Sequence, residues 1–253
     1  MLDATAGSVP GDPYWAPPGP DCWLIESAKA PKRLRIAISL QRLGGETLHP
    51  DCEQAVRHAA ELCASLGHIV EEATPRLDLP LLVPAFVATW SANLAALVDT
   101  IAGFTGVTPR ADLFEGLTWG IYEAGQRVSA SEYLRAKNVL QAASRDVASF
   151  FATHDIWLTT TLGMPPIKLG TFDLEEQDVM KGFLPLFDYV PFTAFQNVTG
   201  QPAINLPLHW NADGLPIGVQ FAGRFGDELT LLQLATQLEQ AAPWMPRYAC
   251  IKV

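Results

Sequence analysis

The chain has 253 residues, of which 49% are hydrophobic and 17% are charged. This composition is typical of a protein with a large buried core and excludes a disordered or low-complexity chain. The 17 Lys and Arg residues against 27 Asp and Glu residues give a formal net charge of −10. Because an acidic chain repels phosphate backbones, we expect no nucleic-acid partner.

The four cysteines lie far apart and form no metal-binding or redox motif. Scattered thiols are typical of a protein in a reducing compartment. The N-terminal residues also lack the basic and apolar regions of a signal peptide, so we expect a cytoplasmic protein. The longest apolar run, 79–98, contains two prolines and several polar residues. We therefore interpret it as a buried core helix and expect no membrane partner.

Residues 1–32 are rich in proline and glycine and predict a loop-like lead-in. Within it, the stretch from Met1 to Gly7 has the pattern of a last helical turn closed by glycine, without an N-cap. Two interpretations remain open for this stretch. It is either a frayed N-terminus or a helix that has been cut through.

Residues 33–75 predict a β-α-β unit. Residues 34–39 alternate like a strand, a helix begins at Pro50 and stops at Gly67, and a short strand follows at 68–72. Two parallel strands joined by a crossover helix are typical of an α/β protein.

Residues 76–152 predict a helical insert, with helices at about 79–102, 111–126 and 129–151. The third begins with Ser129 and Glu132, which have the spacing of a capping box. We expect Trp90 and Trp119, in apolar helices, to pack in the core rather than stack on a ligand.

Residues 153–253 predict the C-terminal strands and helices. A strand over 155–160 runs into a Gly- and Pro-rich loop, and a short helix over 189–199 ends at Gly200. Strands at 202–207 and 217–221 flank an Asp-Gly turn and predict a hairpin. An amphipathic helix over 228–241 follows.

The residues alone reveal no catalytic constellation. No serine lies in a Gly-x-Ser-x-Gly elbow, no two histidines lie four apart, and no phosphate-binding glycine loop follows a strand. We therefore assign no catalytic residue, no metal site and no cofactor. The acidic pairs at 71–72 and 175–176 are expected to be solvated surface charges.

Two strings near the C-terminus closely resemble the amidase signature family: FTAFQNVTGQPAINLPL from Phe192 and NADGLPIGVQFAGRFGDE from Asn211. Residues 1–13 and 156–166 resemble two further stretches of that family, in the order of its C-terminal half. The resemblance implies the C-terminal part of the amidase-signature fold, a mixed β-sheet flanked by helices. Residues 1–253 would then be a single incomplete amidase domain.

Members of that family hydrolyse carboxamides through a Ser–cis-Ser–Lys triad and an acyl-enzyme. The resemblance places the triad upstream of this chain, so no catalytic residue carries over. It implies a pocket wall made by Thr161, Leu162, Pro165, Phe195 and Asn197. The expected function is that of the C-terminal portion of an amidase, inactive alone, which takes a small-molecule amide when an N-terminal half completes it.

Two other hypotheses remain. One is a non-catalytic module, derived from an amidase, that binds small molecules or complements a separate N-terminal half. The other, an unrelated flavodoxin-like α/β protein, explains the β-α-β unit but not the C-terminal strings. Because half a sheet exposes strand edges and apolar surface, we also expect self-association.

Overall fold

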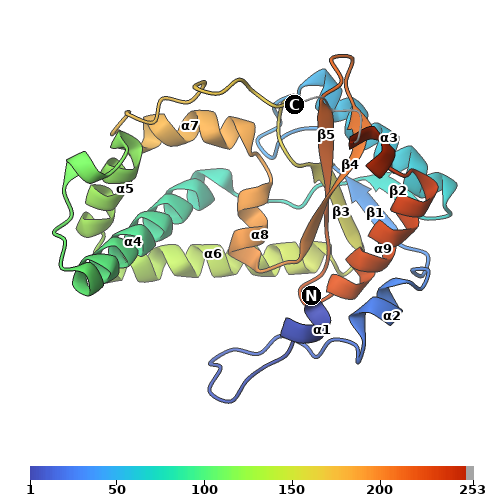
Figure 1. Cartoon of the computed structure of the whole chain (residues 1–253), viewed down its shortest axis with the longest axis horizontal. Helices are drawn as coiled ribbons and strands as arrows, with labels where there is room; N and C mark the ends of the chain where they lie inside the picture. The colour runs from blue at the N-terminus through green and yellow to red at the C-terminus, as the bar shows by residue number, and fades with distance from the viewer. Residues whose placement is uncertain (249–253) are drawn as a thin grey trace.

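A five-stranded mixed sheet forms the centre of the computed structural model, which describes residues 1–248 (Figure 1). The strand order is β2-β1-β3-β5-β4. Strand β1 is parallel to β2 and to β3, whereas β5 is antiparallel to β3 and to β4. The bounds are β1 (Arg35–Ile38), β2 (Ile69–Glu72), β3 (Ile156–Thr160), β4 (Ala203–Trp210) and β5 (Pro216–Ala222). The expected α/β class with a mixed sheet is confirmed.

The helices gather on the two sides of this sheet. Figure 1 shows α3 and α9 together on one side, and the long helices of the middle of the chain on the other. The bounds are α1 (Leu2–Thr5), α2 (Trp23–Ser27), α3 (Pro50–Ser65), α4 (Leu79–Thr105), a 3₁₀ turn η1 (Ala111–Leu113), α5 (Gly116–Arg127), α6 (Ala130–Phe150), α7 (Val179–Tyr189), α8 (Thr193–Thr199), α9 (Glu228–Ala241) and α10 (Met245–Tyr248).

The core lies between the sheet and its covering helices. Trp157, the second residue of β3, is fully buried, and its indole N–H donates to the Ser39 hydroxyl (2.8 Å). Its ring meets Phe150 of α6 and Phe192 edge-on, with ring centroids 6.4 and 5.9 Å apart. These contacts attach the helical part of the chain to the sheet.

Helix α6 begins as its capping box predicts. The Ser129 hydroxyl accepts from the Glu132 N–H (3.2 Å), while the Glu132 carboxylate accepts from the Ser129 N–H (2.8 Å). The helix predicted over 111–126 is instead divided into η1 and α5. Helices α2 and α7 were not predicted.

Helix α4 differs most from its expectation. Its buried positions lie on one side, which packs against α5 and α6, while Trp90, Leu97 and Phe104 are 44%, 55% and 89% exposed. The interpretation as a buried core helix, with Trp90 in the core, is therefore wrong for the other side. Within residues 1–248, α4 alone has the length and apolar composition to cross a membrane.

Glycines allow α5 to approach the segment that precedes α7. A Cβ at Gly116 or Gly120 would overlap the backbone of Glu175 or Gln177. The Leu117 N–H donates to the Leu174 carbonyl (2.8 Å) across this contact. The close approach holds α7 opposite α4 and leaves a hollow between them.

Candidate functional site

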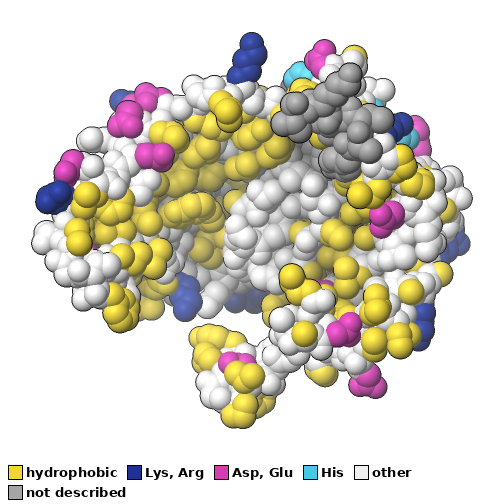
Figure 2. Space-filling model, viewed as in Figure 1, with side chains coloured by type: hydrophobic (Ala, Val, Ile, Leu, Met, Phe, Trp, Pro, Cys, Tyr) yellow, Lys and Arg dark blue, Asp and Glu magenta, His cyan; other side chains and the backbone are white. Residues whose placement is uncertain are grey.

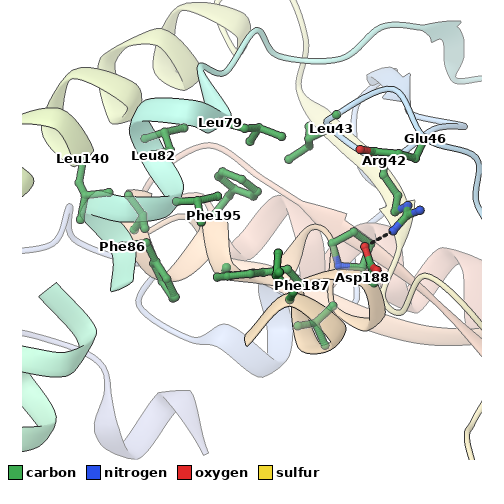
Figure 3. Close-up of a pocket in the computed structure, with 17 residues that line it drawn as sticks. Arg42, Leu43, Glu46, Leu79, Leu82, Phe86, Leu140, Phe187, Asp188 and Phe195 are labelled. Carbon is green, nitrogen blue, oxygen red and sulfur yellow. Dashed lines mark hydrogen bonds and ion pairs between the residues drawn. The ribbon is translucent and has the colours of Figure 1, made fainter. Parts of the chain in front are cut away.

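An apolar pocket lies where the loop after β1 meets the start of α4 and the α7–α8 segment (Figure 3). Its volume is about 180 Å³. Thirteen of its seventeen lining residues are hydrophobic side chains, and they include Leu82, Phe86, Leu140, Phe187 and Phe195. The pocket therefore suits an aliphatic or aromatic group rather than a charged one.

One ion pair stands at the rim of this pocket. The Arg42 guanidinium (Nη1) contacts the Asp188 carboxylate (Oδ1) at 2.5 Å. A tight turn holds Arg42 in place, since its N–H donates to the Glu46 carbonyl (2.8 Å) and its carbonyl accepts from Gly45 (2.9 Å). The Arg42 Nε–H is buried and has no hydrogen-bond partner among residues 1–248. A ligand oxygen in the pocket could accept from it.

A second, wider hollow adjoins the first between α4, α6 and α8. Its volume is about 630 Å³, and it shares Phe86, Leu140 and Val198 with the apolar pocket. Polar groups line it as well, among them Lys137 and Asn197. The apolar pocket and the wider, more polar hollow therefore adjoin each other along these shared residues.

Aromatic side chains form the wall between α4 and α7. Trp90 meets Phe86 and Phe183 at ring-centroid distances of 5.2 and 5.6 Å, and Phe183 stacks on Phe187 at 5.6 Å. Such edge-on and offset pairs add to the energy of burial and hold the rings in fixed positions. Asp178 is the N-cap of α7, and its carboxylate accepts from the Lys181 N–H (3.1 Å).

The five residues expected to form a pocket wall fall in different places. Phe195 lines the apolar pocket and Asn197 lines the wider hollow. The other three, Thr161, Leu162 and Pro165, do not line either of these hollows. Whether any of the five contacts a substrate stays a prediction.

The loop that follows β3 is hydrogen-bonded to the C-terminal end of α7. The Thr161 hydroxyl donates to the Asn205 side chain, and the Leu162 carbonyl accepts from the Thr160 hydroxyl (2.6 Å). Gly163 donates its N–H to the Tyr189 carbonyl (2.8 Å) and accepts from the His49 N–H (3.0 Å). The loop thereby fixes the end of α7, next to Asp188.

Sequence reasoning missed the pair of Arg42 and Asp188. These residues lie 146 positions apart, and no motif joins them. One signal was available: Arg42 follows the carboxyl end of a strand in a β-α-β unit, where ligands commonly bind.

The two buried thiols of residues 1–248 are not activated nucleophiles. Burial raises the pKa of Cys52 to about 11 and that of Cys63 to about 12, so both thiols are protonated at neutral pH. Burial, with a neighbouring His58, lowers the pKa of His209. In residues 1–248 no three His, Cys, Asp or Glu side chains gather as metal ligands.

Comparison with known proteins identifies the family. The amidase family model matches residues 1–232. The protein AmiC of Mycobacterium leprae, named as an amidase, is 35% identical over 84% of this chain and 45% of its own length. The 6-aminohexanoate-cyclic-dimer hydrolase of Paenarthrobacter ureafaciens is 29% identical over 98% of this chain and 52% of its own.

Solved structures agree. The structure of a 6-aminohexanoate cyclic dimer hydrolase complexed with substrate matches 96% of this chain and 52% of its own, with a TM-score of 0.87 and 29% identity. A bacterial aryl acylamidase of the amidase signature family, at 17% identity and a TM-score of 0.72, shares the fold. The chain thus spans about half the length of these relatives. It belongs to the amidase family.

Proposed function

We propose that this chain is the pocket-bearing C-terminal portion of an amidase, a hydrolase of carboxamide C–N bonds, and that it is inactive alone. The observation that carries the proposal is a formed apolar pocket in a chain that aligns with about half of each relative. The substrate would place its acyl group among Phe86, Phe187 and Phe195. An oxygen of that substrate would accept from the Arg42 Nε–H.

The chemistry of the described residues supports inactivity. Acyl-enzyme catalysis needs a nucleophile within hydrogen-bond reach of a base. Among the hydrogen bonds found in residues 1–248, no serine hydroxyl contacts a lysine or a histidine. The nucleophile and base would therefore come from the part of the amidase fold outside this chain.

A chimera tests the proposal. This chain replaces the matched 52% of the Paenarthrobacter hydrolase, so that the rest of the relative completes the fold. We expect the chimera to hydrolyse 6-aminohexanoate cyclic dimer, the substrate class in the relative's name, and the isolated chain not to. Hydrolysis by the isolated chain, or a folded chimera without activity, would contradict the proposal. The intact relative serves as the positive control.

A non-catalytic binding module is the second candidate, because the pocket is already formed in this chain alone. Calorimetric titration of the isolated chain with hexanamide distinguishes the two. Binding by the isolated chain, together with an inactive chimera, would favour the module.

The cellular setting is part of the proposal. A cytoplasmic location is supported by Cys22, Cys52 and Cys63, which are free thiols, as a reducing compartment maintains them. Self-association of the isolated chain is supported by its exposed apolar side chains, which gather in the hollow beside α4 and α7 (Figure 2).

A further inference from the structure

The wider hollow between α4, α6 and α8 contains one basic side chain and no acidic one. Of the twelve described residues that line it, Lys137 is the only Lys or Arg, and none is Asp or Glu. The chain as a whole carries a formal net charge of −10, so this hollow differs in sign from the chain around it. A basic group in a concave site without acidic neighbours attracts a negatively charged ligand.

Lys137 has no partner of opposite charge in the described part of the chain. Residues three and four apart are neighbours on a helix, and ion pairs along a helix form at this spacing. The neighbours of Lys137 at this spacing are uncharged, namely Tyr133, Leu134, Leu140 and Gln141. The ion pairs found within residues 1–248 do not include Lys137 either. Its amino group is therefore available to a ligand.

Three polar side chains accompany Lys137 in the wall of the wider hollow. Tyr133, Lys137 and Gln141 follow one another at successive turns of α6, and Asn197 of α8 lines the same hollow. The side chains of Tyr133, Gln141 and Asn197 form no hydrogen bond with any residue of the described chain. A phenol hydroxyl and two carboxamides can all donate to the oxygens of a carboxylate, beside the amino group of Lys137.

The apolar pocket meets the wider hollow at the end that lies away from Arg42. Figure 3 shows Phe86 and Leu140 at this end, and both residues also line the wider hollow. Lys137 precedes Leu140 by three residues of α6, which is about 4.5 Å along the helix axis. A ligand that begins beside Arg42 and fills the apolar pocket would therefore bring its far end toward Lys137.

We propose that the wider hollow binds a free carboxylate at the far end of the substrate's acyl chain, and that Lys137 pairs with this carboxylate. The substrate class is then the monoamides of dicarboxylic acids. The inference rests on the proposed function, because that function places the acyl chain in the apolar pocket. Lys137 is exposed, so the ion pair should be worth about fivefold in affinity. In this account Lys137 determines specificity and takes no part in the chemistry.

Two six-carbon amides that differ only at the far end of the chain test the inference. Hexanamide ends in a methyl group, whereas adipamate ends in a carboxylate. In calorimetric titrations of the isolated chain, Lys137→Met should weaken adipamate binding about fivefold and leave hexanamide binding unchanged. Lys137→Arg should retain adipamate binding. Arg135→Met is the matched control, because Arg135 lies on α6 but does not line the hollow, and it should change the binding of neither amide.

The active chimera supplies a kinetic readout. Lys137→Met should lower kcat/KM for adipamate about fivefold through KM, with kcat and the hydrolysis of hexanamide unchanged. Equal effects of Lys137→Met on the two amides in an active chimera, or no binding of adipamate to either protein, would overturn the inference and leave the proposed function standing. Selective loss of adipamate binding by the isolated Lys137→Met chain, together with an inactive chimera, would support the carboxylate site and refute the proposed function.

Discussion

Replacing Arg42 with methionine tests how the pocket rim is held. The change removes the ion pair to Asp188 and the buried Nε–H but keeps a long side chain. Asp188 is 66% exposed, so solvent screens the pair, and such pairs contribute about 0–1 kcal/mol. The buried Nε–H without a partner costs about 1–3 kcal/mol. Arg42→Met should therefore leave the free energy of unfolding unchanged or raise it by up to about 3 kcal/mol.

Urea denaturation followed by circular dichroism measures this difference, with the denaturant slope compared between variants. Asp188→Asn is the matched control, because it removes the partner charge and leaves the guanidinium in place. It should lower the free energy of unfolding by about 1 kcal/mol or less. A loss of more than about 2 kcal/mol in Arg42→Met would refute the reasoning, since the ion pair would then outweigh the cost of the buried N–H.

Three further predictions concern the fold. Gly120→Ala should lower the free energy of unfolding by about 1–3 kcal/mol, because its Cβ would overlap the backbone carbonyl of Gln177. Gly103→Ala is the matched control, because Gly103 lies on α4 with open space around it. This variant should raise the free energy of unfolding by about 0.5–1 kcal/mol in the same urea assay. The folded state lowers the pKa of His209, so that on acidification the unfolded chain binds a proton at a higher pH than the folded chain does. Stability should therefore fall as the pH drops below about 6.5. In thermal melts, His209→Gln should make this fall smaller. Iodoacetamide at pH 7 should leave Cys52 and Cys63 unmodified in the native chain by mass spectrometry.

Each of these has a clear contrary result. If Gly120→Ala and Gly103→Ala changed the free energy of unfolding equally, the close contact of α5 with the backbone of Gln177 would not be what makes Gly120 necessary. A stability that is flat between pH 7 and pH 5 would contradict the lowered pKa of His209. Rapid alkylation of Cys52 in the folded chain would show that its thiol is neither buried nor protonated.

Local signals explain why much of the fold was predictable. The helix predicted over 228–241 has the bounds of α9, because Asp227 and an amphipathic pattern mark its start and its face. Strands β4 and β5 form the expected hairpin around Asp213 and Gly214. In each case the residues that decide the structure lie next to one another in the sequence.

The rest depends on contacts between distant residues. Helix α7 contains Gly182 and Pro185, which read as helix breakers, yet Gly182 lies against the side chain of Leu117 on α5. The apolar run of α4 has too little periodicity to indicate that one side stays exposed. The pocket pairs Arg42 with Asp188 across 146 positions, and no sequence spacing predicts such a pair.

Covalent labelling tests the central claim most directly, namely that this chain supplies a pocket and not the nucleophile. The isolated chain and the active chimera are each treated with a fluorophosphonate, and the labelled serine is mapped by mass spectrometry. The account predicts no label on any of the nine serines of this chain and one label in the grafted segment of the chimera. A stoichiometric label on one of those nine serines, with amide hydrolysis by the isolated chain, would contradict it.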